Sequence, residues 1–439
     1  MKRIKTYYII AFFIVCNISA FAQDTLNSAT VEQKSYQLYL DKNWPKLIQF
    51  GNKAISKGFD YYYLQLRIGI AYYERKNYAL ALGHFKSALK YNAEDELSLE
   101  YLYYCYIYNG RNEDARLLSK QFNQALADKI GTSTQSKVGF VMIEAGSKIT
   151  DQKTYASQDP KNTKGNYFKP PVYFQLGLTH FVKNRFSLFH GLTYFSQETF
   201  INKVKQYQYY LKASIPLKHN FLISPSIHYM NIGVSSQKTI ITTDTLWPPG
   251  VPPHSQPPPG APPFKTVTTS TTVSNNSQSN YFVGSLNIQK TANKFVFGIG
   301  TSVSNMSNVT QYINSGLMSY APLGNSKLVL GCTGYLHTTD SYKTSYAAAV
   351  PFVYVQPIHK LSLKLSYMYN VKNNFIEDNG YLVNNSPDVT QSRYSALINF
   401  NINKRVSLYG LYQLENKYEA VQSFNYRYNV IVGGIKITP

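Results

Sequence analysis

Apolar residues recur with two different periods along the chain, and the period changes near residue 137. Between Leu26 and about Ala127 they recur at every third or fourth position, which predicts amphipathic helices. From Lys137 onward they alternate with polar or small residues, which predicts half-buried strands. We therefore predict an all-helical domain over 26–127, a linker over 128–136 and a strand domain over 137–439.

The helical segment contains a repeat of about 34 residues. Counted from Tyr62, a small and an aromatic residue occupy fixed sites of a first helix, and an Ala-Phe-Ala spacing follows in the second. The matching residues are Tyr62, Gly69, Tyr72, Ala81, Phe85 and Ala88. Over about 62–95 this pattern resembles the tetratricopeptide repeat, and the segments on either side add one helical hairpin each. We expect three stacked hairpins, with an unrelated helical bundle as the alternative.

The resemblance to tetratricopeptide repeats also implies a binding surface. Stacked hairpins cover one another's apolar faces and leave a concave groove. In the geometry of that family, Tyr63, Tyr73 and Glu74 of the middle hairpin would face the groove. The resemblance therefore implies that a periplasmic protein or peptide binds there, whereas a spacer role for the helices is the alternative.

The alternating segments are typical of a membrane barrel. In one segment Leu361, Leu363 and Leu365 share a face, and Ser362 and Lys364 share the opposite face. Apolar-out, polar-in segments of about ten residues are typical of transmembrane β-barrels, although a soluble sandwich gives the same alternation. Tyr and Phe near the segment ends favour the barrel, because aromatic girdles lie at membrane interfaces. Counting the segments predicts about fourteen antiparallel strands.

Short and long connections between the predicted strands alternate. The short ones, such as 183–185 and 403–405, lie at the end that holds both termini of the strand domain. Short turns face the periplasm in bacterial barrels, so this end is predicted to be periplasmic. Long connections over 148–170, 237–276 and 374–390 are predicted to lie outside the cell. The connection over 237–276 is rich in proline, which favours a stiff solvated spacer, with a recognition segment as the alternative.

The first residues of the chain predict export. A basic start at Lys2 and Arg3 precedes an apolar stretch, and a small-x-small cleavage site ends at Ala22. Residues 1–22 are therefore predicted to be a signal peptide. An exported chain with a strand barrel belongs in the cell outer membrane, with its helical domain in the periplasm. Cys105 and Cys332 lie in different predicted domains and are not expected to form a disulfide.

Charge adds a prediction for the interior of the barrel. Lys and Arg number 44 against 23 Asp and Glu in the 439 residues. Four basic residues are predicted to line a pore: Lys212, Lys364, Arg393 and Arg427. Arg427 is assigned to the inner face because the alternation makes Tyr426 and Tyr428 part of an outer apolar face. Basic rings in a pore favour anions; alternatively, these charges pair with loop carboxylates or fill a plugged lumen.

No sequence pattern of an enzyme or a cofactor site stands in the context that it requires. The chain lacks a GxSxG elbow, an HExxH pair, a phosphate-binding P-loop and a dinucleotide-binding glycine run. We therefore predict no catalytic, cofactor-binding or metal-binding residues. Nucleic acid is excluded as a partner because an exported barrel does not meet it.

In its architecture the chain resembles bacterial outer-membrane barrels that carry a periplasmic tetratricopeptide domain. Exopolysaccharide exporters and surface-lipoprotein translocators are among them. The resemblance implies a transport or export pore for an anionic solute or polymer, such as a polysaccharide. The alternative is an interaction scaffold that anchors a periplasmic, secretion or adhesion complex. Both hypotheses surround the barrel with outer-membrane lipids, and the oligomeric state stays open.

Overall fold

The computed structural model describes residues 26–439 except 135, 151–153, 156–165, 168–169, 199–201, 247–264, 340–343, 371–373, 386–387 and 420–423. The predicted signal peptide and the proline run therefore lie outside the described residues. The chain divides into two compact units, the first ending at Cys105 and the second beginning at Tyr106. None of the helices in the described part of the chain is long and apolar enough to cross a membrane.

The first unit is a series of antiparallel helices. They are α2 (Ser28–Leu40), α3 (Trp44–Ser56), α4 (Tyr62–Glu74), α5 (Tyr78–Ala88) and the first part of α6 (Glu96–Tyr108). A left-handed residue ends the first helix of each hairpin, at Lys42 (φ 53°), Lys76 (φ 58°) and Gly110 (φ 71°). These three positions are 34 residues apart each time, so the backbone repeats with the period that the sequence predicts.

The residues that carry the repeat lie in the core of the helical unit. Ala81, Phe85 and Ala88 have no exposed surface. A Cβ atom on Gly69 would lie 2.8 Å from Cε1 of Phe85, so the two helices can approach only because residue 69 has no side chain. The side-chain oxygen of Asn77 accepts a hydrogen bond from the Leu80 amide at the start of α5 (3.4 Å). Small residues, a single large ring and a polar cap thus position the hairpins.

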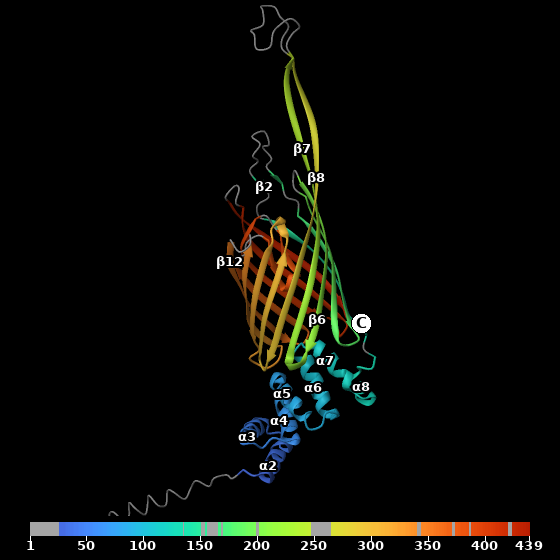
Figure 1. Ribbon diagram of the computed structural model, residues 1–439, viewed down its shortest axis with the longest axis vertical. Coiled ribbons are helices and arrows are strands. Elements are labelled where there is room, and N and C mark those ends of the chain that lie inside the picture. The colour runs from blue at the N-terminus through green and yellow to red at the C-terminus, as the bar shows by residue number, and fades with distance from the viewer. Residues whose placement is uncertain are drawn as a thin grey trace, which may run out of the picture. The chain divides into compact units, whose positions relative to one another are not determined.

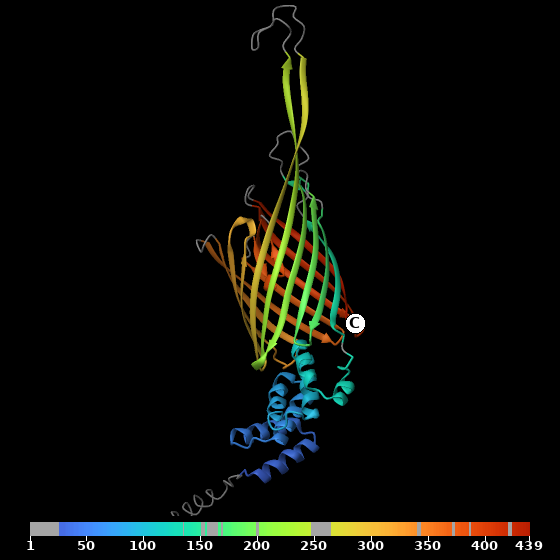
Figure 2. The same cartoon turned by 45° about the vertical axis from the view of Figure 1, so that its right-hand side comes forward.

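The second unit begins with the end of α6, followed by α7 (Asn112–Leu118), η2 (Ser119–Gln121) and α8 (Gln124–Ile130). A closed antiparallel barrel of fourteen strands follows, as the sequence predicts (Figures 1 and 2). Its strands are β1 (Val138–Thr150), β4 (Val172–Val182), β5 (Phe186–Glu198), β6 (Asn202–Leu217), β7 (Phe221–Leu246), β8 (Lys265–Ala292), β9 (Phe295–Ser304), β10 (Gln311–Tyr320), β11 (Leu328–Thr339), β12 (Thr344–Ile358), β13 (Leu361–Tyr369), β16 (Val389–Asn401), β17 (Val406–Glu419) and β18 (Phe424–Ile437).

Closure occurs between the first and the last strand. Val141 of β1 pairs with Ile437 of β18 on one side and with Leu178 of β4 on the other. Paired residues share a face of the sheet, so the alternation of inner and outer side chains continues around the whole barrel. The outer face carries exposed apolar residues on many strands, among them Ile143, Leu176, Ile299, Ile398, Leu408 and Ile437. Such an outward apolar band is the surface that a transmembrane barrel presents to lipid.

Two strands extend well beyond the predicted loop boundary. The segment 237–276 is expected to be a connection, but β7 continues to Leu246 and β8 begins at Lys265. The register runs without interruption to the pair Leu246–Lys265, and Figures 1 and 2 show this long two-stranded ribbon. Thr recurs in both arms, together with Ile in the first and Val in the second, and these β-branched residues favour extended backbone. The prediction of a loop over 237–246 and 265–276 is therefore wrong.

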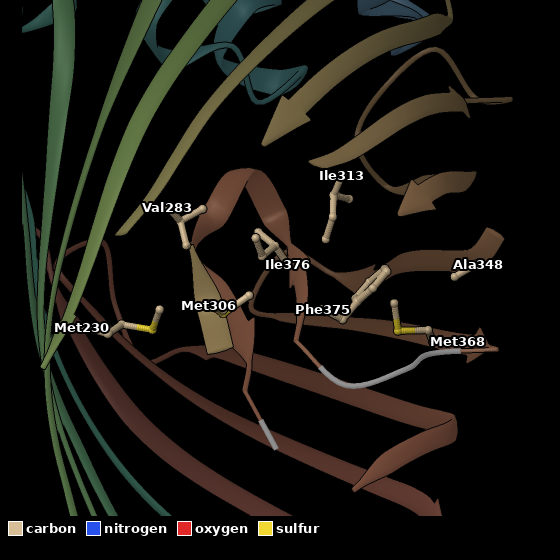
Figure 3. Packing of buried hydrophobic residues seen from close by; sticks show 8 residues of the cluster. All are labelled: Met230, Val283, Met306, Ile313, Ala348, Met368, Phe375 and Ile376. Carbon is tan, nitrogen blue, oxygen red and sulfur yellow. The ribbon is translucent and has the colours of Figure 1, made fainter. Parts of the chain in front are cut away.

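A short hairpin lies inside the barrel. The segment 374–390 is expected to be an extracellular connection, but it contains β14 (Phe375–Glu377), η5 (Asp378–Gly380) and β15 (Leu382–Asn384). Phe375 and Ile376 are buried among residues of the inner barrel wall, as Figure 3 shows. We call residues 375–384 the lumenal hairpin. A second small pair, β2 (Thr154–Tyr155) with β3 (Asn166–Tyr167), forms within the predicted connection 148–170.

Candidate functional site

The turn of the lumenal hairpin is built from three left-handed residues. Asp378 (φ 52°), Asn379 (φ 60°) and Gly380 (φ 81°) follow one another between the two short strands. Asn, Asp and Gly are the residues that adopt this conformation at least cost. A Cβ atom on Gly380 would lie 2.6 Å from Oγ of Ser285 on β8, so glycine also allows the turn to lie directly against the wall.

Backbone groups of this turn bond to side chains of the inner wall. The Asn379 carbonyl accepts hydrogen bonds from Tyr210 OH (3.0 Å) and from Ser226 Oγ (2.5 Å). The Gly380 carbonyl accepts one from Nδ1 of His228 (2.7 Å), and Nε2 of the same ring lies 2.8 Å from Oε1 of Gln208. In the other direction, Nδ2 of Asn379 donates to the Ser224 carbonyl (2.7 Å). The turn is therefore fixed against β6 and β7 by a satisfied polar network.

The first strand of the hairpin contributes apolar packing. Phe375 and Ile376 form one buried cluster with wall residues of five strands and with Met306, which comes from the η4 turn (Met306–Asn308) between β9 and β10. The wall residues are Met230, Val283, Ile313, Ala348 and Met368. Figure 3 shows Phe375 and Ile376 lying between these side chains. Full burial of one such side chain is worth about 1.5–3 kcal/mol, so the apolar contact is a major part of hairpin docking.

An ion pair joins the hairpin to the opposite part of the wall. Nη2 of Arg393 on β16 lies 2.7 and 2.6 Å from the two carboxylate oxygens of Glu377. Both side chains are buried inside the barrel. Arg393 is therefore a lumenal residue, as predicted from the alternation. Its charge is compensated by a loop carboxylate, which is the alternative that the sequence left open.

A second group of charges lies beside this ion pair. The Oε2 atom of Glu415 lies 3.7 Å from Nζ of Lys148 and 3.8 Å from Nζ of Lys417. Glu415 and Lys417 are buried, so the charges attract one another in a poorly screened environment. The basic residues in this part of the lumen thus have acidic neighbours and do not present an uncompensated positive surface.

Tyr381, which lies between the turn and the second strand of the hairpin, contacts a third part of the wall. Nε2 of Gln175 on β4 lies 2.5 Å from Tyr381 OH, and the Tyr381 ring packs against Phe189 and Tyr210 at 5.8 and 5.1 Å between centroids. Nearby, Tyr409 OH donates to Oε2 of Glu144 (2.6 Å). Phe375 also packs edge-on against Tyr335 of β11, at 5.2 Å between centroids. Together with the contacts to β7, β8 and β16, these contacts mean that the hairpin spans the lumen.

Three lysines face the lumen on the turn side of the hairpin, that is, toward the end with the short connections. Lys212, Lys364 and Lys436 each lie within five residues of that end of their strands β6, β13 and β18. Register places all three on the inner face, because they pair with Ser226, Leu397 and Met142 respectively. Nζ of Lys364 lies 4.9 Å from the Phe352 ring centroid and Nζ of Lys436 lies 4.1 Å from that of Phe140. Within the described residues none of these lysines has a carboxylate within 4.0 Å.

The fourth predicted pore residue lies elsewhere. Arg427 is exposed and pairs with Asn416, whereas its neighbours Tyr426 and Tyr428 pair with the inward residues Lys417 and Glu415. The assignment of Arg427 to the lumen is therefore wrong, and so is the outward assignment of Tyr426 and Tyr428. The same error hid Lys436, which shares the inner face with both tyrosines.

A cavity lies between the hairpin tip and the wall formed by β6 to β11. Its volume is about 230 Å³, and Lys212, Asp378 and Asn379 are among its lining residues. Asp378 is exposed at the tip of the hairpin, in contrast to the buried Glu377 beside it. The interior of the barrel therefore contains a defined polar space next to an uncompensated lysine.

The residues predicted for the helical groove separate into two groups. Tyr63 has 56% of its surface exposed, and Arg67 lies between it and the exposed Tyr36, 5.5 and 4.9 Å from the two ring centroids. Tyr73 instead packs edge-on against Tyr78 and Tyr101, at 5.2 and 4.8 Å between centroids. Glu74 is exposed at the end of α4. Tyr36 was missed by sequence reasoning, although it occupies an early position in the preceding repeat.

One buried histidine belongs to the helical unit. Nδ1 of His84 lies 2.7 Å from Oε1 of Gln65, and its ring stacks on Tyr72 at 5.3 Å between centroids. Burial lowers the pKa of His84 to about 4, partly opposed by the negative charge of Asp60. The imidazole is therefore neutral in the folded helices at physiological pH.

Comparison with known proteins finds similar barrels among solved structures. The Acinetobacter baumannii outer membrane protein Omp33 is 9% identical with a TM-score of 0.35, covering 70% of this chain and 100% of its own. A Pseudomonas aeruginosa FadL homologue is 9% identical with a TM-score of 0.40, covering 68% and 89%. A bacterial polysaccharide outer membrane secretin is 8% identical with a TM-score of 0.33, covering 69% and 99%.

Neither a family model nor a curated protein matches the chain. The closed fourteen-stranded barrel with its outward apolar band, preceded by seven described α-helices, is an outer-membrane β-barrel protein with an N-terminal helical region. Sequence identities and TM-scores this low say nothing about its function, which must be inferred from the residues of the lumen.

Proposed function

We propose that this protein is an outer-membrane channel for anionic solutes and that the lumenal hairpin closes it in the state described here. The observation that carries the proposal is the unequal distribution of lumenal charge. Lys212, Lys364 and Lys436 face the lumen with no ion pair among the described residues, whereas Glu144, Glu377 and Glu415 each have a bonded or charged partner. Asp378 at the hairpin tip adds one exposed carboxylate against these three ammonium groups. Uncompensated cations in a low-dielectric tube concentrate anions and repel cations.

The fold supports a channel because a barrel of this size is wide. Barrel diameter grows with strand number, and fourteen strands enclose more space than their own side chains fill. Part of that space is taken by the hairpin, so an anion passes only when the hairpin is displaced from at least part of its contacts. A polymer such as an acidic polysaccharide would require the hairpin to leave the lumen altogether.

The test is a measurement of ion selectivity in planar bilayers. A variant with Lys212→Gln, Lys364→Gln and Lys436→Gln should lose most of the chloride preference that the wild type shows under a salt gradient. Glutamine keeps most of the side-chain volume, so the change isolates the charge. A control variant with Lys203→Gln, Lys205→Gln and Arg427→Gln removes three outward charges and should keep the wild-type reversal potential. Equal reversal potentials in all three proteins would refute the proposal.

A second function, partner binding by the helices, is favoured by the exposed aromatic pair Tyr36 and Tyr63. Large exposed rings beside a guanidinium are suited to contact another protein, because aromatic and Arg side chains dominate protein interfaces. A photo-crosslinking amino acid at position 63 should therefore capture a periplasmic protein in living cells. The same amino acid at Tyr91, which is equally exposed but lies after α5, should not. Capture from both positions, or from neither, would contradict a specific site.

A further inference from the structure

The cavity between the hairpin tip and the barrel wall has a lining that points to a ligand class. On β6 to β10, six inward-facing side chains of the lining are uncharged hydrogen-bonding groups: Ser214, Ser224, Asn287, Gln289, Ser302 and Ser315. They come from five neighbouring strands, β6 to β10, so they surround the space from one continuous wall. Hydroxyl and amide groups both donate and accept, which suits a ligand with several hydroxyl groups.

The cavity is lined by few charged side chains, and they differ in whether they are free to bind a ligand. Glu377 is held by Arg393 at 2.6 Å and is buried, so its charge is compensated. Lys212 has no carboxylate within 4.0 Å among the described residues, and Asp378 is exposed at the tip. An ammonium without a partner binds a carboxylate, while the carboxylate of Asp378 accepts hydrogen bonds from hydroxyl groups.

The volume of the cavity and its apolar lining restrict the class of ligand further. A volume of about 230 Å³ corresponds to about eight water molecules at roughly 30 Å³ each, which is the size of one sugar ring with its substituents. Leu317 and Tyr335 add apolar surface on which the C–H face of a ring can pack. A neutral sugar would leave Lys212 unpaired, and an amino acid would use few of the six polar groups.

We propose that this cavity binds a small hydroxylated carboxylate of the uronic-acid class, with Lys212 holding the carboxylate and the wall hydroxyls and amides holding the ring hydroxyls. The proposal deepens the proposed anion channel and rests on it, since a site inside the lumen selects a solute only if solutes enter. The same chemistry fits a free sugar acid and the end unit of an acidic polysaccharide that reaches the cavity while the hairpin is docked.

Titration calorimetry on the full-length protein, folded in detergent, tests the site. D-glucuronate should bind saturably, and D-glucose should bind about tenfold more weakly, because a charged hydrogen bond is lost. Lys212→Gln should weaken glucuronate binding about tenfold without altering glucose binding, and Lys212→Arg should retain most of it. The matched control is Lys364→Gln, since Lys364 faces the lumen but does not line the cavity. Retention of the fold in each variant is checked by heat-modifiable gel mobility.

Three outcomes would overturn the proposal. Equal losses in Lys212→Gln and Lys364→Gln would show that only general charge attraction is measured. Equal affinities for glucuronate and glutamate would show that the polar side chains of the wall do not recognise the sugar hydroxyl groups. No binding of glucuronate by a protein that shows chloride-selective currents would refute this site but not the anion channel.

Conversely, tight binding of glucuronate with no current in any variant would refute the anion channel but not the binding site. A triglucuronate that binds like glucuronate identifies a polymer unit as a ligand, and one that does not bind restricts the site to the free acid.

Discussion

Arg393 of the barrel wall donates through a single nitrogen, Nη2, to both carboxylate oxygens of Glu377 in the lumenal hairpin, at 2.7 and 2.6 Å. The two residues are only sixteen positions apart, yet one belongs to a membrane-spanning strand and the other to a segment folded into the lumen. Removal of one partner leaves a buried charge without compensation. The pair therefore adds one buried ionic contact to the apolar packing and the turn hydrogen bonds that dock the hairpin.

Arg393→Gln should loosen the hairpin. An uncompensated buried partner costs about 3–5 kcal/mol, so the equilibrium between docked and displaced hairpin should shift by about a hundredfold or more. Hydrogen–deuterium exchange of a peptide covering 375–384 should accelerate accordingly, while peptides from the barrel strands keep their protection. Arg427→Gln, on the outer face, is the matched control and should leave exchange unchanged. Normal protection of the hairpin in Arg393→Gln would show that apolar packing and the turn hydrogen bonds hold it without the ion pair.

Lys436→Gln should reduce anion selectivity, whereas Arg427→Gln should not. The two residues lie on the same strand but on opposite faces, so they differ in access to the lumen and not in sequence neighbourhood. The effect should be larger in 0.1 M salt than in 1 M salt, because the Debye length falls from about 10 Å to about 3 Å. Reversal potentials at both concentrations measure it. A larger effect of Arg427→Gln than of Lys436→Gln would show that Arg427 faces the lumen, as predicted from the sequence.

Gly69→Ala should destabilise the helical unit, and Gly83→Ala should not. The new Cβ atom at position 69 would lie 2.8 Å from the Phe85 ring, an overlap that typically costs 1–3 kcal/mol. At position 83 no atom lies within 4 Å, so alanine should stabilise α5 by about 0.5–1 kcal/mol through its higher helix propensity. Thermal unfolding followed by the helical circular dichroism signal compares the two. Equal melting temperatures would contradict the close packing of α4 on α5.

Stability of the helical unit should fall between pH 7 and pH 5. The pKa of His84 is about 4 in the folded chain and 6.5 in the unfolded chain. Below pH 6.5 the unfolded chain therefore binds a proton that the folded chain excludes, which favours unfolding by about 2 kcal/mol at pH 5. His84→Gln removes this proton linkage and should flatten the dependence over the same range. A wild-type protein equally stable at both pH values would show that His84 titrates normally.

Much of the barrel could be predicted from its sequence because lipid exposure imposes a simple alternation. Leu363, Leu365 and Ile398 lie outward and Lys364 and Arg393 inward, as their alternation predicts. On β18 the alternation gave the wrong face, because tyrosine is amphipathic and occurs on both the lipid-facing and the lumenal side. Tyr426 and Tyr428 pack inside the barrel near Lys417 and Glu415, and the outward face is carried by isoleucines nearer the chain end: Ile431, Ile435 and Ile437.

The lumenal hairpin was missed for a different reason. Its sequence contains a recognisable turn, Asn379-Gly380, flanked by apolar pairs at 375–376 and 382–383. This pattern predicts a hairpin, but an extracellular hairpin carries the same local pattern. Its place in the lumen follows from long-range contacts with His228, Tyr335 and Arg393, which local periodicity does not contain. The pairing of Arg393 and the shape of the cavity were therefore beyond reach from sequence.

The most direct test of the account is a reversible lock on the hairpin. A Cβ atom on Gly380 would lie 3.5 Å from Cβ of Ser285, a separation that a disulfide accepts. Because the φ of 81° at position 380 strains any side chain there, Gly380→Cys alone serves as the control for that strain. Gly380→Cys with Ser285→Cys, in a Cys332→Ala background, can be oxidised and reduced while current across a planar bilayer is recorded. We expect no current in the oxidised protein and a chloride-preferring conductance after reduction. The same steady current before and after reduction, with the cross-link verified by mass spectrometry, would show that the hairpin does not close the channel.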